Sequence, residues 1–121
     1  MDYWFLIAGA VLSLAGMVFH GVVGGKIYVA NVNGSDLQPL TKSLSLVSWH
    51  VFTIFLFVSG LTLAYVAHYP DFVIAVYPVI GVNLLGMVLF IVLGLGKHGA
   101  LLKMPGAFLM GGTALLAWLG V

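Results

Sequence analysis

Long apolar runs separated by short polar stretches dominate the pattern of the chain. Four runs, at about residues 4–24, 44–67, 72–96 and 105–120, approach the roughly 20 apolar residues that a helix needs to cross a bilayer. None alternates polar and apolar residues with the period of two that a membrane barrel requires. The pattern therefore predicts an all-α membrane protein, a four-transmembrane-helix antiparallel bundle that forms a single domain over residues 1–121.

The composition supports this class, because it leaves little material for a water-soluble surface. Hydrophobic residues make up 63% and charged residues 6% of the chain, against about 25% charged residues in a soluble domain. The absence of cysteine excludes disulfides and thiolate ligands. Phosphate-binding loops, nucleophile elbows and zinc-protease helices are also missing. We expect the lipid bilayer and no nucleic acid as a partner, and the sequence leaves open whether the protein is an enzyme.

The lysines predict an orientation. Lys26 and Lys42 flank the first connection, and Lys97 and Lys103 lie in the last, whereas the middle connection and both termini have none. The positive-inside rule places both lysine-bearing connections in the cytoplasm and both termini on the outer side. An aromatic belt at the outer interface agrees with this orientation: Tyr3, Trp4, Tyr65, Tyr69, Tyr77 and Trp118.

Glycines and prolines suggest where the helices begin and end. We expect Gly24 and Gly25 to end the first helix. Pro39 suits the first turn of the second helix, with Ser35 or Asp36 as its cap, and Pro105 suits the first turn of the fourth. The third helix starts either at Pro78 or at Pro70 with a kink.

Two histidines interrupt the apolar runs at nearly the same depth. His20 precedes Lys26 and His50 follows Lys42, at roughly 9 and 12 Å along the helix axes at the usual rise per residue. His20 shares a helix side with the small residues Gly9, Ser13 and Gly16, which favours an interior position. An ionisable side chain within the membrane is costly and indicates a functional site.

Imidazole is a ligand of haem iron, copper and zinc, and facing histidines in helix bundles often build such sites. The sequence therefore predicts a cofactor site at His20 and His50 for haem b or a transition metal. His98, on the same side of the membrane, is the further candidate ligand for a bare metal. A haem with two axial imidazoles requires the first two helices to lie diagonally or apart, because directly packed helices are only about 8–10 Å apart.

Other polar and soft side chains carry weaker predictions. Asn83 is the one amide deep within an apolar run, and we expect it to form an interhelical hydrogen bond or to line a cavity. His68 lies in the middle connection and is expected to be solvated. Four methionines are soft ligands for copper, although we expect them to serve packing: Met17, Met87, Met104 and Met110.

The stretches FHGVVGGKIY and SWHVF, followed by a last run preceded by proline, resemble a group of small four-span bacterial inner-membrane proteins without assigned activity. Members carry one histidine late in the first helix and a Trp-His pair early in the second, matched here by His20, Trp49 and His50. The resemblance implies a multi-pass protein of the bacterial inner membrane. It supplies no reaction.

The sequence is compatible with three functions. The first is an inner-membrane protein that holds haem b or a transition metal between His20 and His50, for electron transfer or cofactor handling. In the second, the histidines are structural, and the chain is an accessory or assembly subunit of a larger membrane complex or a homo-oligomer. In the third, the chain is a small proton-linked carrier whose cavity reaches Asn83.

Overall fold

The structure is a computed structural model that describes all 121 residues, and every element in it is helical. The first helical rod runs without interruption from Tyr3 to Asn33. A second long helix follows, and two shorter helices with single-turn segments complete the chain. In order, the elements are α1 (Tyr3–Val18), the π-helical η1 (Phe19–Gly24), α2 (Gly25–Asn33), α3 (Pro39–His68), the 3₁₀-helical η2 (Pro70–Ala75), α4 (Val76–Leu95), the 3₁₀-helical η3 (Gly99–Lys103) and α5 (Gly106–Gly120).

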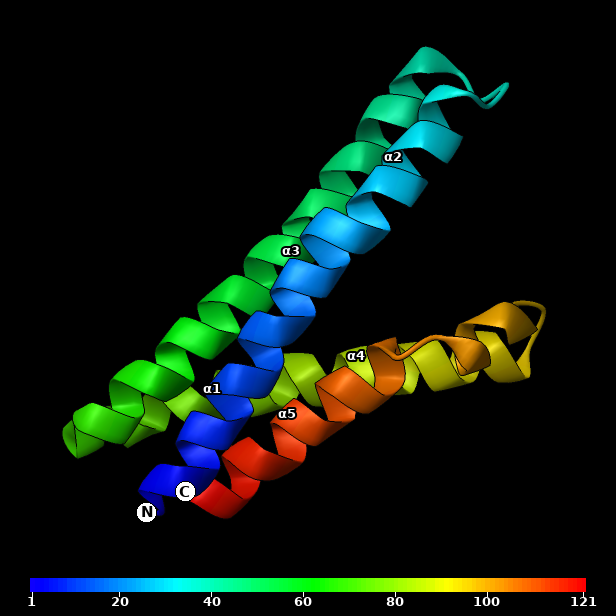
Figure 1. Ribbon diagram of the computed structural model, residues 1–121. Helices are drawn as coiled ribbons and strands as arrows, with labels where there is room; N and C mark the ends of the chain where they lie inside the picture. The colour runs from blue at the N-terminus through cyan, green and yellow to red at the C-terminus, as the bar shows by residue number, and fades with distance from the viewer.

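These helices form two antiparallel pairs that diverge like the limbs of a V (Figure 1). We call residues 3–68 the first arm and residues 70–120 the second arm. The arms meet at the closed end, where both termini lie and where the Asp2 backbone N–H donates to the Gly120 carbonyl at 2.8 Å. They separate toward the open end, where the connections 34–38 and 96–105 form the two tips. The all-helical prediction is confirmed, but the helices do not pack as one bundle along their full length.

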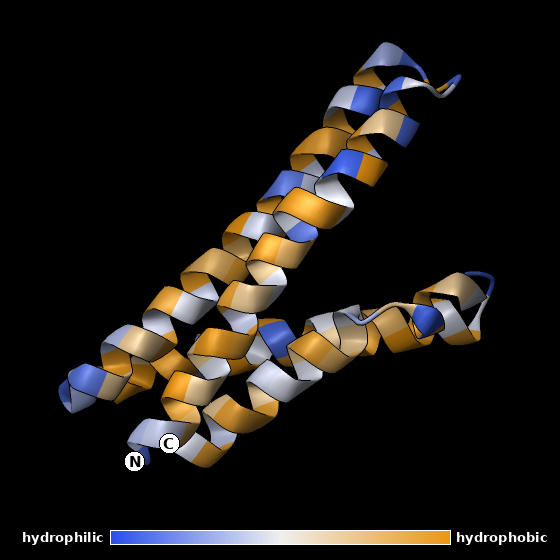
Figure 2. Cartoon of the chain, viewed as in Figure 1, coloured by the Kyte–Doolittle hydropathy of each residue, from blue (hydrophilic) through white to orange (hydrophobic).

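Three helices are long and apolar enough to cross a membrane: Tyr3–Asn33, Pro39–His68 and Pro70–Leu95. The fourth, α5, has 15 residues and is also apolar. Polar residues gather at the two tips and at the turn between the arms, whereas apolar residues cover most of the surface between them (Figure 2). This distribution is that of a membrane protein, in which the solvent around the middle of each helix is hydrocarbon.

An apolar core holds the arms together at the closed end. Leu6 of α1, Leu63 and Val66 of α3, Val76 of α4 and Ala117 of α5 are all fully buried in one cluster. Glycines let these helices approach closely. A Cβ at Gly120 would lie 2.6 Å from Leu6, so any side chain there would push α1 and α5 apart.

The two helices of the second arm interlock through methionines. Met110 of α5 fills the space above Gly86 of α4, and Met87 of α4 fills the space above Gly111 of α5. Met110 is 3% exposed. Packing is therefore the role of these two methionines, as the sequence predicted.

Four polar side chains are buried within the protein. The buried polar residues of the chain are Ser13, Ser59, Asn83 and Thr113, one from each of α1, α3, α4 and α5. Asn83 Nδ2 donates to Ser59 Oγ at 3.2 Å and to the Val79 carbonyl, and Ser13 Oγ donates to the α3 backbone at Leu56. The interhelical hydrogen bond predicted for Asn83 is confirmed, and it links the two arms.

Several predicted helix ends are wrong. Gly24 and Gly25 do not end the first helix, because both adopt helical backbone angles, and no glycine in the chain has a positive φ. The cap of α3 is Gln38, while Ser35 Oγ donates back to the Val32 carbonyl. Pro105 is the cap of α5 and not a residue of its first turn.

The start of the third helix combines both alternatives. Pro70 opens the 3₁₀ segment η2, Phe72 leaves helical geometry, and α4 begins at Val76 with Pro78 in its first turn. A proline is tolerated there because the first N–H groups of a helix have no intrahelical partner.

Candidate functional site

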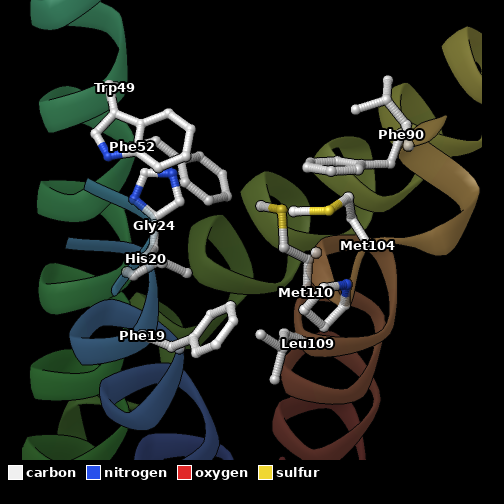
Figure 3. A pocket seen from close by; sticks show the side chains of 14 residues that line it. Phe19, His20, Gly24, Trp49, Phe52, Phe90, Met104, Leu109 and Met110 are labelled. Carbon is white, nitrogen blue, oxygen red and sulfur yellow. The ribbon is translucent and has the colours of Figure 1, made fainter. Parts of the chain in front are cut away.

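A cavity lies between the arms, just beyond the level at which they separate. Its volume is about 160 Å³, and 14 residues line it, nearly all of them apolar. Figure 3 shows Phe19, His20, Trp49 and Phe52 of the first arm facing Phe90, Met104, Leu109 and Met110 of the second. We call this space the inter-arm cavity. His20 is its one ionisable lining residue.

Helix periodicity explains which residues of α3 reach the site. Trp49, Phe52, Thr53 and Leu56 follow the i, i+3, i+4, i+7 spacing of one helix face, and all four meet α1 or η1 or line the cavity. His50 is off this face and is exposed. Its sequence neighbour Trp49, and not His50, therefore meets His20.

The π-helical turn and its glycines bring the two helices of the first arm together at this level. Gly21 and Gly24 lie under α3, and a Cβ on them would lie 3.1 Å from Thr53 and 3.0 Å from Trp49. A π-helical turn holds more residues than an α-helical turn, so residues spaced by four drift less around the helix axis. His20, Gly24 and Tyr28 therefore all lie on the side of the first rod that faces α3. Such turns occur often at functional sites.

Three aromatic rings stack across this contact. The rings of His20 and Trp49 have centroids 3.9 Å apart and planes inclined by 17°, and those of Tyr28 and Trp49 are 4.2 Å apart and inclined by 12°. His20 and Tyr28 are about 12 Å apart along their helix, which leaves room for the indole between them. The stack fixes the plane of the His20 ring at the wall of the cavity.

A hydrogen bond to Thr53 holds the rotation of the His20 ring. His20 Nδ1 lies 2.8 Å from Thr53 Oγ1, and the Thr53 hydroxyl donates to the Trp49 carbonyl at 3.4 Å. Of the two tautomers of His20, the one in which Nδ1–H donates to Thr53 Oγ1 lets the hydroxyl keep its bond to the Trp49 carbonyl. In that tautomer the lone pair lies on Nε2, which makes no hydrogen bond within the protein. A hydrogen bond of this kind to one ring nitrogen orients a ligating or proton-accepting imidazole.

Of the predicted site residues, only His20 lines the cavity. His20 lines the inter-arm cavity, whereas His50 does not. His98 is exposed at the tip of the second arm, where its backbone N–H donates to the Leu93 carbonyl. No three histidine or carboxylate side chains form a group that could hold a metal ion. The geometry gives no support to a ligand shared by His20 and His50, and haem b or a transition metal stays a prediction.

His68 lies at the closed end, far along α3 from the cavity. It is exposed, as predicted for a solvated residue, and its Nε2 is 3.4 Å from the Tyr3 hydroxyl. The sequence pattern did not reveal the role of Thr53, Trp49 or the glycines of η1. The i, i+3, i+4 spacing of Trp49, Phe52 and Thr53 was the available signal.

The chain was compared with protein-family models, with curated proteins and with solved structures, and nothing matches it.

Proposed function

We propose that this chain is a multi-pass membrane protein that binds a single-ring hydroxylated cofactor, a phenol or quinol, in the inter-arm cavity. The observation that carries the proposal is the His20 ring, the one ionisable group in the wall of an otherwise apolar cavity, held in place by Thr53 and Trp49. Apolar pockets with a few fixed polar groups are the usual form of small-molecule sites.

The size of the cavity favours one ring. An apolar cavity of about 150 Å³ in another protein holds benzene, and the inter-arm cavity has about 160 Å³. A porphyrin with four pyrrole rings exceeds this volume, so haem b would require the arms to move apart. In the proposed complex the ring lies between Phe52 and Phe90, which line opposite walls of the cavity (Figure 3), and a ring hydroxyl donates to His20.

We also propose the topology that the lysines predict. All four apolar helical segments cross the bacterial inner membrane, with the closed end and both termini on the periplasmic side. The four lysines support this, because they all lie in the halves of the arms that reach the open end. The role is cofactor handling or electron transport beside a larger membrane complex, which would supply the redox centre.

Fluorescence of Trp49 tests the binding proposal. In a variant with Trp4→Phe and Trp118→Phe, Trp49 is the only tryptophan. Titration of the detergent-purified protein with hydroquinone under reducing conditions is expected to give saturable quenching. His20→Ala and Thr53→Val are expected to weaken binding about 3- to 10-fold, the worth of one hydrogen bond. Thr53→Ser, which keeps the hydroxyl, is expected to bind as the parent does.

His50→Ala is the matched control, because His50 does not line the cavity. It should leave the dissociation constant unchanged. The absence of saturable quenching would refute the proposal, and so would equal losses in His20→Ala and His50→Ala. A Soret band in the purified protein that disappears in both histidine variants would instead establish the haem prediction.

A further inference from the structure

A fully buried side-chain oxygen of α4 has no hydrogen-bond donor. Asn83 is 1% exposed, and its Oδ1 has no partner within the protein. The Val79 carbonyl, 2.9 Å from Asn83 Nδ2, fixes the orientation of the amide, because only its N–H side can bond to a carbonyl. A buried acceptor without a donor costs free energy, and water or an ion is what satisfies such a group where the protein does not.

The hydroxyl in contact with this amide has the complementary need. Ser59 Oγ accepts from Asn83 Nδ2 at 3.2 Å, and its own proton is donated to no group of the protein. Ser59 is only 5% exposed. An unpaired acceptor and an unpaired donor therefore belong to two residues that touch each other in the interior.

Two further hydroxyls reach the same level of the helices. Gly60 and Gly112 pack against the residues on either side of Ser13. Because Ser59 and Thr113 are the sequence neighbours of these two glycines, the three hydroxyls lie at one level of α1, α3 and α5. Ser13 and Thr113 are each 1% exposed and donate to backbone carbonyls, which leaves their oxygen lone pairs free to accept.

We infer that this level binds one buried water molecule, which accepts from Ser59 and donates to Asn83 Oδ1 and to the hydroxyl oxygen of Ser13 or Thr113. Water fits because the site requires one small group that both donates and accepts, and three hydrogen bonds are the typical number for a buried water. A cation fits less well, since all four buried polar residues are neutral and no carboxylate offsets its charge. The inference does not depend on the ligand proposed for the inter-arm cavity.

Energetic coupling between residues that share no direct hydrogen bond tests the inference. Asn83→Leu is combined with Ser13→Ala and with Thr113→Val, and the unfolding equilibrium constants are measured in mixed micelles. The water is expected to couple Asn83 to one of the two hydroxyls by about 3- to 10-fold, the worth of one hydrogen bond. Ser48→Ala is the control, because Ser48 is exposed and bonds only to the Leu44 carbonyl. It should be additive with Asn83→Leu, and additivity of both test pairs overturns the inference.

A measurement on the parent protein covers the case in which these variants do not fold. In protein with ¹⁵N-labelled asparagine, the side-chain amide protons of Asn83 are expected to show a nuclear Overhauser effect to water with the sign of a long-lived, bound molecule. Asn31 and Asn33 are exposed and give the reference for surface water. The absence of this signal at Asn83 overturns the inference. A stability that rises with sodium chloride but not with choline chloride also overturns it, because the site would then belong to a cation.

Discussion

Gly60 of α3 offers the sharpest test of how the first arm is held together. Its helix approaches α1 so closely that a Cβ at this position would lie 2.6 Å from Leu14 Cγ, 2.7 Å from Leu14 Cδ2 and 3.2 Å from the Ala10 carbonyl oxygen. The first of these atoms is a branch point and the last belongs to the backbone. Neither can yield by rotating the end of a flexible chain, so Gly60→Ala must move a helix or force Leu14 into another rotamer.

The magnitude follows from a comparison with Gly81 of α4. A Cβ at Gly81 meets nothing within 4 Å. Both residues lie within helices, so replacement by alanine brings the same gain in helix propensity of about 0.5–1 kcal/mol. The difference between the two variants is then the overpacking cost, about 1–3 kcal/mol. We expect Gly60→Ala to be less stable than Gly81→Ala by that amount.

Unfolding of the purified protein by sodium dodecyl sulfate in mixed micelles, followed by circular dichroism, measures both free energies on one scale. A difference of 1.4 kcal/mol is a factor of ten in an equilibrium constant. The expected difference between the unfolding free energies of the two variants is therefore large enough to measure. Equal stabilities of Gly60→Ala and Gly81→Ala would refute the close approach of α1 and α3 and, with it, the helix contact that positions His20.

Three further predictions concern other parts of the chain. Asp2→Ala should cost about 0.5–2 kcal/mol in the same unfolding assay, because the Asp2 carboxylate accepts hydrogen bonds from the first turn of α1; Asp2→Asn should retain most of the stability. Met110→Ala should cost about 2–5 kcal/mol by opening a cavity in the second arm, whereas replacement of the half-exposed Met104 should change little, and similar losses for both would contradict the packing described. Cysteines at Asp36 and Asp71, introduced into a chain that has none, should react with an impermeant maleimide from opposite sides of the membrane; labelling from one side would reject the proposed topology.

Hydrophobic pattern was enough to locate the helical segments, because length and apolarity alone determine which parts of a chain can enter a bilayer. The ends of those segments depended on contacts that the pattern does not contain. Gly24 and Gly25 look like a helix end in the sequence, yet they remain helical, and the Trp49 ring occupies the space that a side chain on either of them would take. The reason for glycine at these positions therefore lies in a residue 24 to 25 positions away.

For a similar reason, the sequence predicted the level of the candidate site in the helices but not the residues that face it. Depth along a helix follows from residue spacing, and it singled out His20 and His50 together. Direction around the helix depends on packing, and the faces of α3 could not be ranked while its polar residues formed no continuous stripe. The structure resolves this through Trp49 and Thr53, which turn His50 outward. The splay of the arms also follows from long-range contacts, since the small residues that join α1 to α5 stop at Gly16.

The divergence of the arms has a consequence for the surrounding lipid. The first arm, with helices of 31 and 30 residues, is about 45 Å long, against a hydrocarbon thickness of about 30 Å. In the topology proposed above, the arms are joined at the closed end and cannot both stand along the membrane normal, so the protein would occupy a larger area in the leaflet of the open end than in the opposite leaflet. A protein that takes a larger area in one leaflet than in the other is wedge-shaped, and it fits a curved bilayer better than a flat one. Crowded side by side, copies of this chain would bend the membrane toward the closed end, and local curvature would in turn decide where they gather.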